Sequence, residues 1–326
     1  MKLIRKVLTV NTKRMLEAVA LGLFLQLLQL SLSNPVYAGM KLMKSTPNRT
    51  GTPSTPKKSN FTFTTIDVPS ATKTAANGNS TEAIVGQYDD NAGTHGFVLQ
   101  NGGFTTIDVP GAVGFSGING VNAKGDLTGT YQDANKRLHA FFKSGDSFIT
   151  LDPPGASNSQ GGFVNAQDEV VGGYRDSTRR RHAFLWSRKT GVFTTIDPPE
   201  SLKAKFGPIA LGINSPGQIV GTYVDMAGNR HGFLLSDGVY TTLDVPEAGV
   251  STLAEGISNS GKIVGFYFGA DGNSHGFILI DGVYTTIDVP NSTSTSLFSI
   301  NAKGEVVGEY DDAIGSTHGF VGTPTR

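Results

Sequence analysis

The stretch "HGFLLSDGVYTTLDVP" runs from His231 to Pro246, and "HGFILIDGVYTTIDVP" follows from His275 to Pro290. Each copy places Asp-Gly between two runs that are rich in β-branched and aromatic residues. Asp-Gly favours a two-residue hairpin turn, because a type I′ turn needs positive φ at both of its central residues. The stretch therefore predicts a β-hairpin that the chain uses more than once.

Three elements of this stretch and its surroundings recur six times, with a period of about 44 residues. The six His residues of the chain all precede Gly-Phe or Ala-Phe, at His95, His139, His182, His231, His275 and His318. The Asp of the "TTIDVP" element returns as Asp67, Asp108, Asp152, Asp197, Asp244 and Asp288. A Gly-x-Tyr element places Tyr88, Tyr131, Tyr174, Tyr223, Tyr267 and Tyr310. Nine residues before each Tyr stands Asn79, Asn122, Asn165, Asn214, Ser258 or Asn301.

One repeat reads as four short strands separated by turn residues, which is typical of a β-propeller blade. The repetitive part opens with a lone fourth strand (61–69) and closes with a third strand, "HGFVG", that has no successor. Each orphan strand completes the other if the array is a ring. We therefore predict an all-β fold, a six-bladed β-propeller of four-stranded repeats, in which the N-terminal strand joins the last blade and removes a free sheet edge. A solenoid is the alternative, but it does not need a divided unit.

Three segments follow from composition. Residues 1–38 combine a basic start, an apolar run and a small-residue cleavage pattern at "VYA", which predicts a signal peptide; an uncleaved membrane anchor is the alternative. Residues 39–60 are rich in Ser, Thr, Pro and Lys and predict a disordered linker. Residues 61–326 form the single propeller domain. Its predicted blades are 70–110, 111–154, 155–199, 200–246, 247–290, and 291–326 with 61–69.

Charge and cysteine content narrow the classes of partner. The neutral total conceals a split, because ten of the 27 basic residues but only one of the 27 acidic residues precede residue 61. The remaining 17 basic and 26 acidic residues give the propeller a formal charge near −9, which disfavours nucleic acid as a ligand. The chain has no Cys, so disulfides and thiolate metal sites are excluded. We expect a secreted or periplasmic monomer without a cofactor and without membrane contact beyond the signal segment.

The repeat also resembles a known family. The patterns "HAFF" at 139, "HAFLW" at 182 and "GIN..G.IVG.Y" around Asn214 are similar to those of the HAF family of probable extracellular repeat proteins. The resemblance covers residues 61–326 and implies secretion and a propeller-like repeat. It implies no chemistry. Four of the six copies here have Gly where the family name has Ala.

The His and Asp markers predict a structural pair within each blade. Counting outward from the hairpin turn at Asp237-Gly238 sets His231 opposite Asp244, at a separation that a hydrogen bond can span. The same count pairs His95 with Asp108, His139 with Asp152, His182 with Asp197 and His275 with Asp288, and His318 with Asp67 across the ring closure. A catalytic dyad or metal site is the competing interpretation. Sixfold repetition disfavours it, because one reaction needs one pair beside one substrate.

An Asp two residues after the repeat Tyr begins most of the loops between the second and third strands, at Asp90, Asp133, Asp176, Asp225 and Asp312; Gly269 breaks the series. Calcium is the functional interpretation, but calcium loops supply several carboxylates in one short stretch. We favour a turn in which the Asp side chain bonds its own backbone.

Function should lie where the repeats differ. The variable loops follow each Pro, at 111–117, 155–162, 200–210, 247–255 and 291–299, and they include Phe115, Phe206 and Phe298. Arg175, Arg179, Arg180 and Arg181 gather near one loop of the third blade, either as a solvated charge run or as an anion-binding patch.

These features predict a secreted, non-catalytic module that binds a glycan or an extracellular protein through the variable loops. A structural surface or matrix protein is the second interpretation. The third is a glycoside hydrolase or lyase using Glu200, Glu247 and Glu255, which would need two carboxyls across a cleft.

Overall fold

The computed structural model describes residues 61–198, 204–246, 248–249 and 251–325. The predicted signal segment (1–38), the predicted linker (39–60), Glu200 and Glu247 lie outside these ranges. All regular elements of the described residues are β-strands. Within these ranges no helix is long and apolar enough to cross a membrane.

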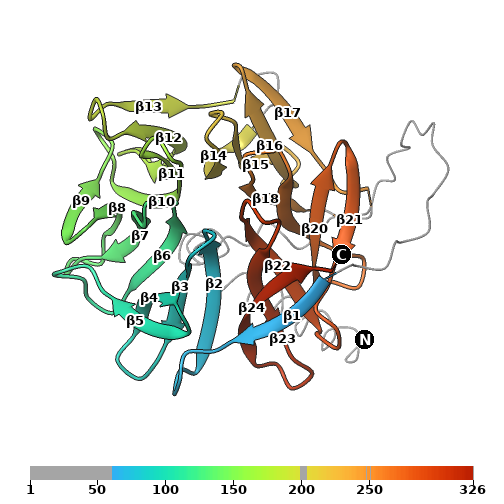
Figure 1. Ribbon diagram of the computed structural model, residues 1–326. Coiled ribbons are helices and arrows are strands. Elements are labelled where there is room, and N and C mark those ends of the chain that lie inside the picture. The colour runs from blue at the N-terminus through green and yellow to red at the C-terminus, as the bar shows by residue number, and fades with distance from the viewer. Residues whose placement is uncertain (1–60, 199–203, 247, 250, 326) are drawn as a thin grey trace, which may run out of the picture. The chain divides into compact units, whose positions relative to one another are not determined.

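The described strands form six four-stranded antiparallel sheets, the blades, arranged in a ring (Figure 1). Blades 1 to 3 consist of β2 (Lys73–Asn79), β3 (Ile84–Asp89), β4 (Thr94–Gln100) and β5 (Gly103–Ile107); β6 (Ser116–Val121), β7 (Leu127–Gln132), β8 (Leu138–Ser144) and β9 (Ser147–Leu151); and β10 (Asn158–Val164), β11 (Glu169–Arg175), β12 (Arg181–Ser187) and β13 (Phe193–Ile196). Blades 4 to 6 consist of β14 (Ala204–Ile213), β15 (Ile219–Asp225), β16 (Arg230–Ser236) and β17 (Val239–Leu243); β18 (Thr252–Ile257), β19 (Ile263–Phe268), β20 (Ser274–Ile280) and β21 (Val283–Ile287); and β22 (Ser294–Ile300), β23 (Val306–Asp311), β24 (Thr317–Pro324) and β1 (Phe61–Ile66).

The predicted ring closure is confirmed. The N-terminal strand β1 pairs antiparallel with β24, from Phe61 opposite Pro324 to Ile66 opposite Gly319 (Figure 1). The aromatic rings of Phe63 and Phe320 meet edge to face across this seam, with centroids 5.7 Å apart. The closing strand thus completes a blade with the same order and the same core packing as the other five.

The Gly-x-Tyr and His-Gly-Phe elements meet within each blade, and their residue types follow from that contact. In blade 4, a Cβ on Gly221 would lie 2.1 Å from the carbonyl oxygen of Ile209 and 2.8 Å from the ring of Phe233. Only glycine leaves room there for the buried ring. Phe233 and its counterparts in the other third strands are almost completely buried and form part of the hydrophobic core, as Phe97, Phe141, Phe184, Phe277 and Phe320. The repeated glycine therefore allows the repeated phenylalanine to pack.

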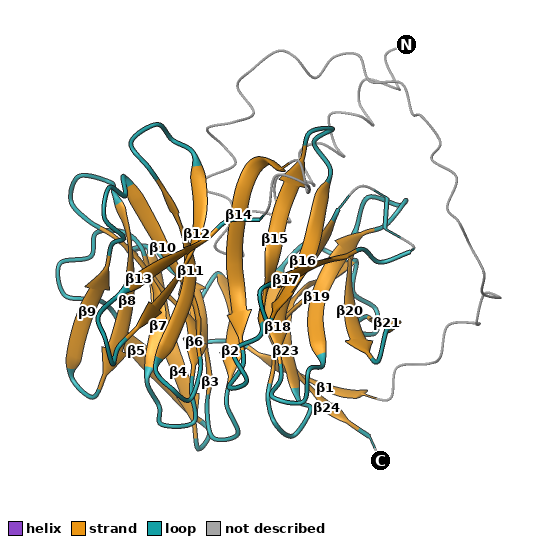
Figure 2. Ribbon diagram, turned by 90° about the horizontal axis from the view of Figure 1, so that it is seen from above, coloured by secondary structure: helices purple, strands orange, loops and turns teal. Residues whose placement is uncertain are grey.

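The strands run side by side between two faces of the ring, and loops cover both ends (Figure 2). We call one the variable-loop face; it carries the connections from each fourth strand to the next blade and from each second strand to the third. The turn face carries the connections from first to second and from third to fourth strands. The antiparallel order within each blade fixes this division.

Ile66 provides a test of the closure, because it lies on β1 and is only 5 % exposed. We expect Ile66→Ala to lower the free energy of unfolding by about 2–5 kcal/mol, the usual cost of removing a buried aliphatic side chain. Ile287→Ala, at the same repeat position within blade 5, should cost a similar amount, and Thr64→Ala, at an exposed position of β1, should change little. Urea denaturation measures all three. An unchanged stability in Ile66→Ala alone would show that β1 does not close the ring.

Candidate functional site

Each repeat His lies between two carboxylates at the variable-loop face. In blade 2, His139 Nδ1 lies 2.8 Å from Asp152 Oδ2, and His139 Nε2 lies 3.3 Å from Asp133 Oδ2. In blade 4, His231 makes the same two contacts, with Asp244 at 2.9 Å and Asp225 at 3.2 Å. The Nδ1 contacts of the other blades join His95 to Asp108, His182 to Asp197, His275 to Asp288 and His318 to Asp67, at 2.7–2.9 Å. The last of these crosses the ring closure.

The repeat Tyr covers the imidazole and links it to the fourth strand. In blade 3 the rings of Tyr174 and His182 stack with centroids 5.0 Å apart, and the Tyr174 hydroxyl lies 3.1 Å from Thr195 Oγ1. In blade 6 the corresponding hydroxyl, on Tyr310, bonds Thr65 of the closing strand at 2.9 Å. Tyr, His, Thr and two Asp side chains thus form one hydrogen-bonded unit per blade. Such a unit is a scaffold element, because every blade has one.

The two carboxylates favour the charged imidazolium. The hydrogen bond to Asp244 raises the pKa of His231 above its ordinary value against the opposing effect of burial, and the hydrogen bond to Asp288 does the same for His275. Burial alone would lower the pKa of His95 and of His318. The hydrogen bonds and charges of their Asp partners outweigh it, so the pKa of both is also raised.

The Asp residues that were weighed as calcium ligands bond the backbone of their own loops. Asp133 Oδ1 accepts N–H bonds from Asn135 and Arg137 at 2.8 and 2.9 Å, and Asp312 Oδ1 accepts bonds from Ile314 and Ser316 at 2.9 Å. Asp90, Asp176 and Asp225 act in the same way. Where Gly269 interrupts the series, Asp271 takes over the contact with His275 Nε2, at 3.3 Å. No cluster of three metal-ligating side chains was found among the described residues.

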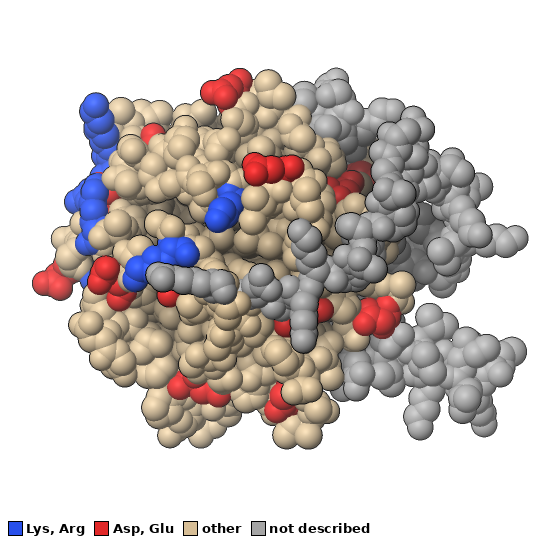
Figure 3. Space-filling view, turned by 45° about the vertical axis from the view of Figure 1, so that its right-hand side comes forward, with Lys and Arg blue, Asp and Glu red and all other residues tan. Residues whose placement is uncertain are grey.

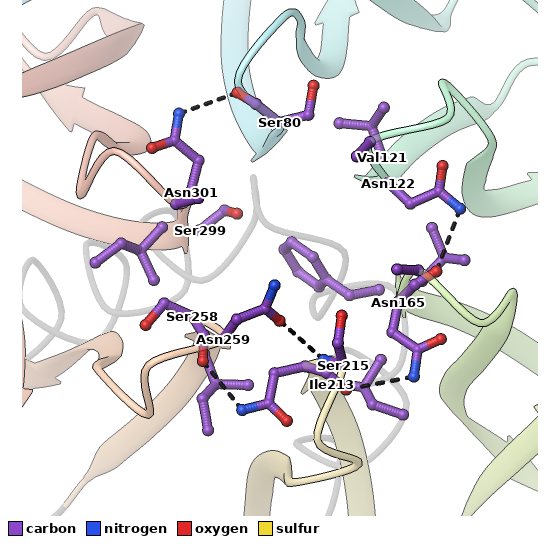
Figure 4. A pocket seen from close by; sticks show the side chains of 18 of the residues that line it. Ser80, Val121, Asn122, Asn165, Ile213, Ser215, Ser258, Asn259, Ser299 and Asn301 are labelled. Carbon is purple, nitrogen blue, oxygen red and sulfur yellow. Dashed lines mark hydrogen bonds between the residues drawn. The ribbon is translucent and has the colours of Figure 1, made fainter.

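A belt of Asn side chains surrounds the channel at the turn face (Figure 4). Asn165 Oδ1 accepts N–H bonds from Gln167 and Glu169 of its own turn, and its Nδ2 donates to the carbonyl oxygen of Asn214 in the next blade at 3.3 Å. Further links of this kind run from Asn122 to Asn165, from Asn214 to Ser258 and from Asn301 to Ser80. The sequence revealed the periodic Asn but not its role, which is to tie neighbouring blades together.

The belt encloses a cavity of about 150 Å³ lined by turns of all six blades, with Val121, Ile213 and Ile300 beneath the polar rim (Figure 4). In blade 1 the equivalent of the belt Asn is Ser80, whose Oγ accepts the N–H groups of Glu82 and Ala83. Asn79 was counted as a member, but the blade 1 turn is one residue shorter, so Asn79 falls at the position of Val121. The belt amides already bond protein groups, and the cavity therefore offers little to a ligand.

The first strand of every blade contains a register shift near the channel, and one residue bulges there. In blade 5 the bulged residue is Glu255, which was predicted to lie in or beside a variable loop. It lies within β18 instead and is 8 % exposed. Burial raises its pKa to about 8 despite the nearby charge of Arg230. A bulge was not foreseen, and without it the residue would be placed closer to the strand end.

A second buried carboxyl lies close enough to interact with Glu255. Glu309 of β23 is 6 % exposed, and burial together with the charge of Asp311 raises its pKa to about 8. Its Oε2 is buried without a hydrogen-bond partner among the described residues. Sequence analysis missed Glu309, although it stands at the variable x of Gly-x-Tyr, where other blades have Gln87, Thr130, Gly173, Thr222 and Phe266.

The predicted arginine patch divides into two parts. Arg179 and Arg180 are exposed at a loop tip, whereas Arg175 and Arg181 are partly buried and directly opposite each other on β11 and β12. A third arginine, Arg230 of blade 4, lies near enough to act on Arg181, whose pKa falls to about 9 through burial and the charges of Arg175 and Arg230. Arg230 escaped notice because it comes from another blade.

The three aromatic residues assigned to variable loops have different surroundings. Phe298 is buried in β22, where its ring meets that of Phe266 edge to face. Phe115 is partly buried just before β6. Phe206, near the start of β14, is 42 % exposed and remains available on the variable-loop face.

Charged side chains are sparse on the side of the described residues that Figure 3 shows. Acidic and basic groups both occur there, and uncharged surface separates them. This side therefore has no continuous basic track of the kind that the nucleic-acid backbone requires.

No family model and no curated protein matches this chain. The resemblance to the HAF family therefore stays a prediction. Solved structures do match, among them AofleA from Arthrobotrys oligospora, with a TM-score of 0.53, 10 % identity and coverage of 80 % of this chain and 85 % of that one. TolB from Acinetobacter baumannii also gives 0.53 at 10 % identity, over 75 % of this chain and 64 % of that one.

The β-propeller domain of the Trilobed protease from Pyrococcus furiosus matches with a TM-score of 0.50 at 10 % identity, over 76 % of this chain and 94 % of that one. That propeller is described as having an open velcro topology, whereas β1 and β24 pair in this chain. At such low identity, these likenesses show the propeller fold alone.

The imidazole units predict how stability depends on pH. His95, His231, His275 and His318 have raised pKa values in the folded state, so their contribution is complete below the unfolded pKa of about 6.5 and is lost as pH rises through the folded values. Glu255 and Glu309 act in the same direction up to a pH of about 8. We therefore expect the free energy of unfolding to decrease from pH 6 to pH 8, and His231→Gln to weaken this decrease. Urea denaturation across this range measures it, and a stability that increases with pH would contradict the scheme.

The belt predicts different costs for two substitutions of Asn214. Asn214→Ser reproduces the residue at position 258 and keeps an acceptor for the turn, so it should lose about 1 kcal/mol. Asn214→Asp sets a carboxylate against the carbonyl oxygen of Ser258 and the amide oxygen of Gln218, and it should cost more, about 1–3 kcal/mol. Thermal unfolding ranks the two. Equal stability of the Asp variant and the wild type would remove the belt as an inter-blade tie.

Proposed function

We propose that this protein is a secreted, non-catalytic binding module that holds a glycan, or failing that a protein, on its variable-loop face. Secretion is inferred from the basic and apolar character of residues 1–38. The choice of face is supported by the way the repeated side chains are used. His, Tyr and Asp bond within their own blades, and the belt Asn bonds the next blade. Recognition then falls to side chains that differ between blades.

The observation that carries this proposal is the identity of the residue before each repeat His. At this position, beside the first strand of the next blade, blades 1, 2, 5 and 6 have Thr94, Leu138, Ser274 and Thr317. Blades 3 and 4 have Arg181 and Arg230. Two adjacent blades thus replace small or apolar residues with arginine at one sector of the ring, which gives this face a local chemistry that the scaffold does not require.

Phe206 adds an apolar surface to the same sector. It is 42 % exposed, and the neighbouring Gly207 is so close to Arg181 that a Cβ would collide with its carbonyl oxygen. An exposed aromatic ring beside hydrogen-bond donors is suited to a sugar, which has an apolar ring face and polar edges. This combination favours a glycan over a protein ligand.

A carboxylate-based glycoside hydrolase or lyase is the second candidate, favoured by one observation. Glu255 and Glu309 are buried, interact electrostatically and have pKa values raised to about 8, as the acid of such an enzyme requires. Their burial opposes the idea, because a substrate must reach both groups. Turnover of a bound saccharide that disappears in Glu309→Gln would establish the enzyme in place of the binding module.

The proposal is tested by screening the purified protein on a glycan array and repeating the measurement with Phe206→Ala. We expect a bound saccharide and a loss of affinity of about tenfold in the variant, because the sugar loses its apolar support. Val239→Ala is the matched control, since Val239 is also an exposed apolar residue but lies at the turn face. Failure to bind any saccharide, or equal losses in both variants, would overturn the proposal.

A further inference from the structure

Arg175 and Arg181 are held on the side of blade 3 that faces blade 4. They are directly opposite each other across β11 and β12. Ala183, two residues beyond Arg181 on the same side of β12, packs with Ala210 and Phe233 of blade 4. The strand pairing therefore fixes where both side chains begin, and the two guanidinium groups cannot separate without leaving the interface between the blades.

Arg230 approaches from the next interface along the ring. Its backbone forms a parallel bridge with Ser251, immediately before β18. The side chain of Arg230 is close enough to Glu255 and to Arg181 for each of these charges to affect its neighbour. Three guanidinium groups from two interfaces thus lie in one sector of the variable-loop face, with Phe206 beside them.

Like charges at such positions are unfavourable without a partner of opposite sign. The Nε of Arg181 is buried and has no hydrogen-bond partner among the described residues. The acid nearest in charge to the cluster, Glu255, is itself largely protonated at neutral pH because burial raises its pKa to about 8. The cluster is therefore arranged for an anion supplied from outside the described residues.

We propose that Arg181, with Arg175 and Arg230, binds the carboxylate of an acidic sugar in the glycan ligand. The planar guanidinium fork matches a planar carboxylate with two parallel hydrogen bonds, and partial burial strengthens them. The ring of Phe206 supports the apolar face of the same sugar, and the protonated carboxyl of Glu255 supplies a donor. This inference rests on the proposed glycan-binding function and names the class of glycan.

The experiment compares an oligogalacturonate with its methyl ester by isothermal titration calorimetry on the full chain. The ester keeps the sugar and removes the charge. We expect the acid to bind about 10- to 100-fold more tightly than the ester, which corresponds to charge-assisted hydrogen bonds. A sulfated neutral polysaccharide tests whether another oxyanion suffices, and binding of that polymer in preference to the acid would overturn the assignment of a carboxylate.

Two variants and one control locate the site. Arg181→Leu and Arg230→Thr introduce residues that other blades carry at the same position, so the fold should tolerate them. Each should remove most of the preference for the acid and leave binding of the ester unchanged. Arg179→Gln, at the exposed tip of the blade 3 loop, should alter neither. Tight binding of both ligands that no variant changes would refute the arginine site and leave the glycan-binding proposal intact, whereas the binding of no saccharide at all would refute both.

Discussion

The ladder of hydrogen bonds between β1 and β24 is the constraint on which the whole arrangement depends. It joins Phe61–Ile66 to the third strand of the last blade and gives blade 6 the four strands of every other blade. Without it, β24 would present a free edge, and His318 would lack Asp67. With it, each blade contacts two neighbours, so the belt of Asn and the inter-blade cores continue around the ring. Position in the ring, more than local strand propensity, therefore decides which side chains meet.

The repeated and the non-repeated residues have separate tasks. Tyr174, His182 and Thr195 consume one another's hydrogen-bonding groups within a blade, and Asn165 does so between blades. This satisfaction is why a ring of six His–Asp pairs, which resembles a set of catalytic dyads in sequence, acts as a scaffold. The unusual chemistry arises where single blades depart from the pattern, at Arg181, Arg230, Glu255 and Glu309. Those departures are all close to the central channel and are absent from the outer strands.

The fold could be predicted from the sequence because its determining features are local and repeated. A two-residue turn fixes hairpin register, so the partner of His231 follows from counting, and the orphan strands at the two ends indicate closure. The site could not be predicted in the same way. Glu255 is displaced by a bulge that leaves no mark in the residue pattern, and the belt member Ser80 is concealed by a turn one residue shorter than the others. Arg230 joins Arg181 only because two blades pack at a particular angle, which no single repeat encodes.

The seam also imposes an order on the birth of the protein. Of the described strands, β1 leaves the ribosome first and its partner β24 last, with 250 residues between the start of β24 and the end of β1. The first-made strand must therefore wait, unpaired with its final neighbour, until the whole ring has been synthesised. Until then blade 6 has three strands, and Phe320 lacks the ring of Phe63 that later covers it. The nascent chain carries its own clasp from the outset and can fasten it only when synthesis ends.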